Sequence, residues 1–67
     1  MIQITVNGQT RSVPHGTTIV QLLEALRLPT RHLAVEVNLQ VVPRRAHAAH
    51  RLSEGDRLEI VTLVGGG

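Results

Sequence analysis

The chain ends in Val64-Gly65-Gly66-Gly67, and this run of glycines is the part of the sequence most suited to chemistry. Glycine has no Cβ, so a glycine run can thread a narrow channel and lie flat against another protein. The carboxylate of Gly67 has no side chain crowding it. We therefore expect this carboxylate to be the working group, presented to an enzyme that reacts with it. An ordinary flexible chain end is the alternative interpretation.

The segment before the glycines is expected to position them. Residues 57–64 form a strand-like run that follows the turn-forming cluster 53–56. If Leu58 and Ile60 face the core, every second residue faces the opposite side of the sheet. Apolar side chains there, next to the glycines, would form a surface for partner docking, with an arginine at the start of the strand adding charge. The predicted docking residues are Val61, Leu63, Val64 and Arg57.

Two strands and a helix are predicted in the first half of the chain. Apolar residues alternate with polar ones over 2–6, and Asn7-Gly8 then marks a tight hairpin turn into a second strand, 9–13. Thr18 begins a helix, because Gln21 lies at the spacing of a capping box. An apolar stripe predicts that this helix packs on a sheet, and Pro29 is expected to end it. The stripe consists of Ile19, Leu22, Leu23 and Leu26.

The second half predicts a strand over 33–37, a turn over 38–40 and a short strand at 41–42. A single helical turn is expected over 46–50. This order predicts an α+β, β-grasp domain over 1–64, in which a mixed sheet of four to five strands packs on one main helix, followed by a flexible glycine tail, 65–67. The first and last strands would be parallel at the sheet centre, and Ile2, Ile4, Val6, Leu58 and Ile60 would meet the helix.

Composition restricts the class of protein. The 67 residues include no cysteine, so neither a disulfide nor a thiolate metal site is expected. No segment predicts a membrane span or a leader, and we expect a soluble, cytoplasmic protein without membrane contact. The net charge of +2 comes with scattered arginines and no aromatic residue that could stack on a base, so no nucleic-acid partner is expected.

No residue pattern predicts catalysis or a metal site. His47 and His50 would lie at i and i+3 on a helical turn, but no third ligand is near, and zinc sites need at least three protein ligands. No pairing of a nucleophile with a base is apparent. We therefore expect a substrate of enzymes that binds no cofactor and is not itself an enzyme.

The chain resembles the ThiS family, the ubiquitin-like sulfur carriers of thiamine biosynthesis, in several short motifs and in their order along the sequence. They are Val6-Asn7-Gly8, Gly16-Thr17-Thr18 with Leu22-Leu23, Ala34-Val35 with Asn38, Val42-Pro43-Arg44, and residues 54–61 leading to Val64-Gly65-Gly66-Gly67. Three positions depart from the family: Leu39 stands where glycine is common, and His47 and Leu63 stand where aromatic residues are common. These departures are expected to affect a turn and docking surfaces.

The resemblance implies a mechanism and a set of partners. A ThiF-type adenylyltransferase would consume ATP to adenylate the Gly67 carboxylate, with Gly65 and Gly66 entering the partner active sites. A sulfur donor system with a cysteine desulfurase would convert Gly67 to a thiocarboxylate, and the thiazole synthase ThiG would receive the sulfur. The chain has no lysine or cysteine. Only its α-amino group and weak hydroxyls could therefore capture the activated carboxylate, because arginine stays protonated.

Other functions share parts of this pattern. A carrier for molybdopterin synthesis or for tRNA thiolation would use the same chemistry and also end in Gly-Gly. A ubiquitin-like modifier would share the activation step and differ in its lysine acceptor. A small RNA-binding β-grasp module of the TGS type would need no terminal glycines. The short length, the Val-Gly-Gly-Gly end and the Glu54-Gly55-Asp56-Arg57 turn favour the ThiS family.

Overall fold

A computed structural model describes residues 1–29 and 31–63 of the chain. The predicted glycine tail and Val64 lie outside these residues. The elements, in chain order, are β1 (Ile2–Val6), β2 (Gln9–Val13), α1 (Ile19–Ala25), β3 (Leu33–Val37), β4 (Gln40–Val42), the 3-10 helix η1 (Arg44–Ala46) and β5 (Arg57–Thr62).

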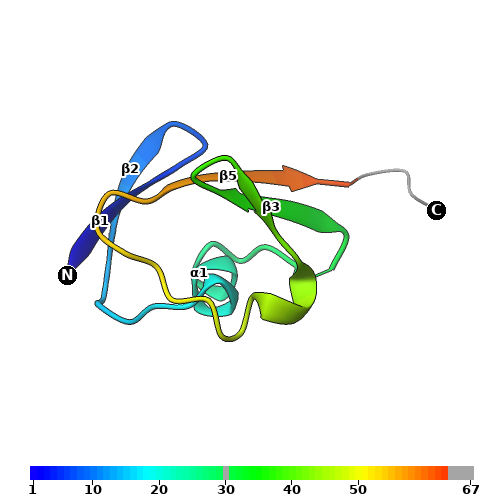
Figure 1. Ribbon diagram of the computed structural model, residues 1–67, viewed down its shortest axis with the longest axis horizontal. Helices are drawn as coiled ribbons and strands as arrows, with labels where there is room; N and C mark the ends of the chain where they lie inside the picture. Colours follow the sequence, from blue (N-terminus) through cyan, green and yellow to red (C-terminus); the bar gives the residue numbers. More distant parts are fainter. Residues whose placement is uncertain (30, 64–67) are drawn as a thin grey trace.

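The strands form one mixed sheet with the order β2-β1-β5-β3-β4, and α1 packs on one side of it (Figure 1). Strand β5 lies at the centre, parallel to β1 and antiparallel to β3. Both hairpins, β1–β2 and β3–β4, are antiparallel. The predicted α+β, β-grasp fold with parallel first and last strands is confirmed.

Each hairpin turns through two residues with positive φ. These are Asn7 (φ 49°) and Gly8 (φ 84°) in the first, and Asn38 (φ 53°) and Leu39 (φ 69°) in the second. Positive φ at both central residues matches the right-handed twist of the flanking strands, which explains the asparagines. Leucine is a costly choice at the second position, because its Cβ crowds the backbone in the left-handed region. The predicted turn at 38–40 is thus two residues long, and Gln40 already belongs to β4.

The predicted capping box begins α1. The Gln21 N–H donates to Thr18 Oγ1 at 3.2 Å, and the Thr18 N–H donates to Gln21 Oε1 at 2.9 Å. Each side chain therefore satisfies a backbone donor of the other residue, at a helix end where such donors lack intrahelical partners.

The helix ends at Ala25, earlier than the prediction that Pro29 ends it. The chain leaves the helix through Arg27, whose φ is 58°. The Arg27 N–H donates to the Glu24 carbonyl at 3.0 Å, and the Leu28 N–H donates to the Leu23 carbonyl at 2.9 Å. These bonds form a Schellman motif with arginine at the position where glycine is usual. Without that glycine, the sequence offers no local signal for this end.

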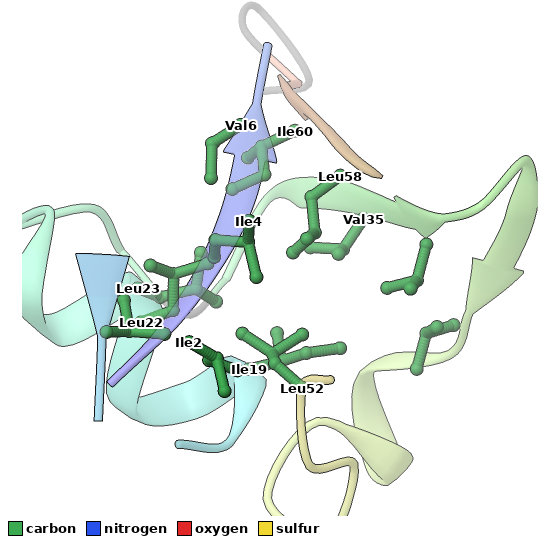
Figure 2. Packing of buried hydrophobic residues seen from close by; sticks show 13 residues of the cluster. Ile2, Ile4, Val6, Ile19, Leu22, Leu23, Val35, Leu52, Leu58 and Ile60 are labelled. Atoms are coloured by element: carbon green, nitrogen blue, oxygen red, sulfur yellow. The ribbon is translucent and has the colours of Figure 1, made fainter. Parts of the chain in front are cut away.

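The core is aliphatic and lies between α1 and the sheet, as Figure 2 shows. All five predicted inward residues of β1 and β5 are buried, as are three of the four stripe residues; Leu26 is partly buried. Leu52 is a core residue that strand and helix periodicity did not predict. It is held because its N–H donates to the Thr17 carbonyl at 2.8 Å, which brings the loop before β5 alongside the start of α1.

The helical turn expected over 46–50 begins earlier than predicted. The 3-10 helix covers Arg44–Ala46, directly after Pro43. Proline fixes φ and supplies no N–H, so it is well suited to precede a helix. Turns continue to Ala49, and the His50 N–H donates to the Ala46 carbonyl at 2.9 Å.

Replacing Leu23 by alanine should strongly destabilise the fold. Leu23 is fully buried at the centre of the core, so Leu23→Ala should lower the free energy of unfolding by about 2–5 kcal/mol. Urea denaturation followed by circular dichroism measures this value. Val41→Ala is the matched control, because Val41 is 69% exposed and its truncation should change stability by less than about 0.5 kcal/mol. Equal losses in the two variants would contradict the assignment of the core.

Candidate functional site

The candidate site is the end of β5, where the sheet leads into residues 64–67. On one side, β3 supports this end throughout: Leu33 pairs with Thr62, and the Leu63 N–H donates to the His32 carbonyl at 2.7 Å. Hydrogen bonding between the two segments therefore continues one residue beyond the strand itself. The backbone is fixed up to the last residue that the structure describes.

On the other side, β1 is too short to follow β5 to its end. The two strands pair in register only at Thr5 with Arg57 and at Val6 with Leu58. The side chain of Asn7 then takes the place of the missing strand. The Ile60 N–H donates to Asn7 Oδ1 at 2.7 Å, and Asn7 Nδ2 donates to the Ile60 carbonyl at 3.1 Å. A single side-chain amide thus hydrogen-bonds as a backbone peptide group would and extends the support of β5 by two residues.

Asn38 performs a related task at the start of β5. The Arg57 N–H donates to Asn38 Oδ1 at 3.0 Å, and Asn38 Nδ2 donates to Asp56 Oδ1 at 3.0 Å. The second carboxylate oxygen of Asp56 accepts the Ser53 N–H at 2.8 Å, which closes the predicted turn 53–56. An asparagine from each hairpin therefore holds β5, one near each end.

The predicted docking residues of β5 are accessible. Val61 is 57% exposed and Leu63 is 56% exposed, on the side of the sheet opposite α1, and Arg57 is also exposed. Val64, Gly65, Gly66 and Gly67 lie outside the described residues. The exposure agrees with the expected alternation along the strand, and the docking role stays a prediction.

His47 is not part of a docking surface, contrary to the expectation for this position. The side chain is 2% exposed, and its Nε2 lies 2.9 Å from the Val42 carbonyl oxygen, to which it donates. The His47 carbonyl in turn accepts the Val20 N–H at 3.3 Å. His47 therefore fastens the segment after η1 to both β4 and α1. The sequence does not reveal that this segment folds back against the core.

Within residues 1–29 and 31–63, no group of three or more His, Cys, Asp or Glu side chains is placed to hold a metal ion. The same residues include no helix that is long and apolar enough to cross a membrane.

Comparison with known proteins identifies the family. The model of the ThiS family matches residues 4–67, which is nearly the whole chain. The chain belongs to the ThiS family. Members of this family are sulfur carrier proteins of thiamine biosynthesis and not enzymes. The family match covers both asparagines that hold β5.

Individual relatives agree with the family match. The chain is 33% identical to the sulfur carrier protein ThiS of Escherichia coli, over 98% of this chain and 100% of that protein. It is 38% identical over 66 residues to a thiazole synthase of Paramagnetospirillum magneticum, of whose length it spans 20%. The crystal structure of ThiS from Geobacter metallireducens superposes with a TM-score of 0.83 at 32% identity, covering 98% of this chain and 100% of that one.

Sequence reasoning missed the role of the two asparagines. The pair Asn7-Gly8 predicted a hairpin turn, and Asn38 predicted another turn. Neither pattern indicated that the side chains reach β5, which for Asn7 lies 53 residues further along the chain. Their position at the first residue of each turn, beside a predicted central strand, is the signal that could have suggested it.

Removing the Asn7 amide should loosen the end of β5. Glycine keeps the positive φ of this position, so Asn7→Gly tests the side chain without straining the turn. The part-buried N–H and carbonyl of Ile60 lose their partner, and we expect a loss of about 1–3 kcal/mol in the free energy of unfolding.

Asn38→Gly is the matched control for this substitution. Its amide contacts are exposed to water, which can replace them, so the loss should be smaller. Urea denaturation and hydrogen exchange of the Ile60 amide measure both effects. An unchanged exchange rate at Ile60 in Asn7→Gly would contradict the bridging role.

Proposed function

We propose that this chain carries sulfur for thiazole formation in thiamine biosynthesis, as a thiocarboxylate on Gly67. The observation that supports this most is the ThiS family match over residues 4–67, which includes all three terminal glycines. The fold adds support, because β5 is the central strand of the sheet and its backbone is fixed as far as Leu63. A firmly held strand would deliver the residues after it at a defined point on the surface.

The chemistry follows from the weak reactivity of a carboxylate. A ThiF-type adenylyltransferase joins the Gly67 carboxylate to the AMP part of ATP and releases pyrophosphate. The sulfur donor system, fed by a cysteine desulfurase, supplies a persulfide whose terminal sulfur attacks the carbonyl carbon. The new C–S bond replaces the C–O bond to AMP, which leaves, and a thiol reductant then cleaves the S–S bond so that the thiocarboxylate remains on Gly67. Gly65 and Gly66, which lack side chains, let the carboxylate enter the narrow active sites of these enzymes.

The acceptor of the sulfur is a thiazole synthase of the ThiG type. Two relatives support this partner: thiazole synthases of Paramagnetospirillum magneticum and Magnetococcus marinus are each 38% identical to this chain over 66 residues. The chain spans 20% of the length of each of these proteins. The carrier itself catalyses nothing and holds no cofactor, since ATP is consumed by the activating enzyme. We place these reactions in the cytoplasm.

Docking uses the side of β5 that faces away from α1. Val61 and Leu63 are exposed there, and Val64 and the charge of Arg57 would contribute to the same contact. Large apolar side chains held in water contribute little to folding, so their contribution is expected in complexes. Both enzymes must bind the domain while the glycines enter their active sites. This surface includes Leu63, which precedes the first of these glycines by two positions in the sequence.

Deleting Gly66 and Gly67 should stop activation and leave the fold intact. The deleted residues come six and seven positions after Ile60, the last residue of the core. Circular dichroism should be unchanged, whereas ATP–pyrophosphate exchange with the activating enzyme should disappear. A chain extended beyond Gly67 should fail in the same way, because its glycine carboxylate becomes an amide. Undiminished exchange in the truncated chain would refute the carrier function.

Replacing Leu63 by aspartate should weaken docking without unfolding the domain. Leu63 is 56% exposed, so Leu63→Asp should change the melting temperature little while weakening the binding of both enzymes by about tenfold or more. Calorimetric titration against each enzyme measures the effect. Ala25→Asp is the control, since Ala25 is an exposed residue of α1, which packs on the other side of the sheet, and this variant should bind normally. Normal binding by Leu63→Asp would place the docking surface elsewhere.

A further inference from the structure

The face of the sheet opposite α1 carries an acidic pair between exposed apolar residues. Glu36 of β3 lies directly opposite Glu59 of β5, and Val41 of β4 lies opposite Glu36 on its other side. The next pair along the two central strands is Ala34 with Val61. We call the residues on this side the outer face: Ala34, Glu36, Val41, Arg57, Glu59 and Val61. Val41 is 69% exposed and Val61 57% exposed, so nothing in the described part of the chain covers them.

The opposition of two carboxylates is unfavourable in the free protein. Like charges directly opposite each other on neighbouring strands repel, and such pairs destabilise a sheet. Among residues 1–29 and 31–63, side-chain hydrogen bonds engage the carboxylates of Glu54 and Asp56 but neither Glu36 nor Glu59. The repulsion is therefore not offset by internal hydrogen bonds. It is also local, because the whole chain carries a formal charge of +2.

The neighbouring charge on this face is Arg57, two residues before Glu59 on the same strand. Arg57 lines a shallow hollow together with Thr5, Leu39 and Glu59. It lies at the start of β5, whereas the acidic pair lies at mid-strand with the exposed Val61 beyond it. The outer face thus changes from cationic to anionic to apolar in the direction of the glycines.

We propose that the outer face binds a protein surface that presents an arginine or lysine between apolar side chains. The cation would lie between Glu36 and Glu59, and Val41 and Val61 would pack on either side of it. Charge decides the class of partner: carboxylates repel nucleic-acid phosphates and anionic lipid head groups, and they attract a basic side chain. Binding would also relieve the repulsion between the two carboxylates, so the pair gains more from the cation than a single glutamate would.

This inference rests on the proposed function for the identity of the partner, which we take to be the thiazole synthase. The outer face includes Val61 and adjoins Leu63, and it is therefore continuous with the proposed docking surface. The new element is the acidic pair, which specifies a cation on the partner. A contact of this kind strengthens association at low salt and weakens as salt screens the charges.

The test compares three variants that each remove one negative charge. Glu59→Gln and Glu36→Gln change the outer face, and Glu24→Gln changes an exposed glutamate of α1, which packs on the other side of the sheet. Each is titrated calorimetrically, in its unsulfurated form, against the thiazole synthase at low and at high salt. Wild-type affinity should fall as salt rises. At low salt, Glu59→Gln and Glu36→Gln should bind about fivefold more weakly, with a smaller salt dependence, and Glu24→Gln should match wild type.

Melting curves supply the second readout. Because Glu59→Gln removes the repulsion from Glu36, it should melt at the wild-type temperature or above while binding more weakly. A merely structural role would lower the melting temperature and the affinity together, and that result would overturn the proposal. So would wild-type affinity in both outer-face variants, an equal loss in Glu24→Gln, or absence of binding by the wild-type chain. Sulfur loading is not needed for these titrations, so the outcome is independent of pyrophosphate exchange, which tests the carrier function.

Discussion

The position of β5 at the centre of the sheet is the constraint on which the rest of the structure depends. This strand must be held on both sides, yet β1 pairs in register with it at only two positions. The side-chain amide of Asn7 closes the gap, since it offers Ile60 one acceptor and one donor in the way a peptide group does. Asn38 secures the opposite end. Both asparagines are available because a two-residue hairpin turn requires positive φ, which asparagine tolerates better than most residues.

The same constraint links the core to the proposed site. Residues of β5 alternate between the two faces of the sheet: Leu58 and Ile60 are buried against α1, and Glu59 and Val61 are exposed. Burial of the first set fixes the register of the strand, because a shift by one residue would exchange the two faces. The positions of Glu59 and Val61 are therefore fixed as precisely as those of the core residues, although these two side chains contribute little to the core. A substitution in the core could thus disturb the proposed docking surface without changing any of its residues.

Most of the fold could be predicted from the sequence because its signals are local. Alternation over β1, the Asn7-Gly8 turn and the capping box of Thr18 with Gln21 each depend on residues a few positions apart. The errors have two origins. The early end of α1 depends on Arg27 adopting positive φ at a position where the usual glycine signal is missing. The burial of His47 depends on a bond to Val42 and on the packing of the segment around η1 against the core, which the sequence does not reveal. Of the candidate site, the exposure of Val61 and Leu63 followed from alternation, whereas the bridging asparagines required knowledge of which strands become neighbours.

Unfavourable local choices occur on both sides of the sheet. On the helix side, the capping box and the buried apolar stripe agree with the fold, but Arg27 adopts positive φ where the chain leaves α1. The opposite side carries the two carboxylates of Glu36 and Glu59 in direct opposition. Beside them, Leu39 adopts a left-handed conformation that typically costs a non-glycine residue about 1–2 kcal/mol, and its side chain is 89% exposed. Natural proteins tend to keep locally unfavourable residues of this kind where function requires them. The buried core gives the domain enough stability to carry these residues, so the direct opposition of Glu36 and Glu59 supports the uncovered face as the surface that partners contact.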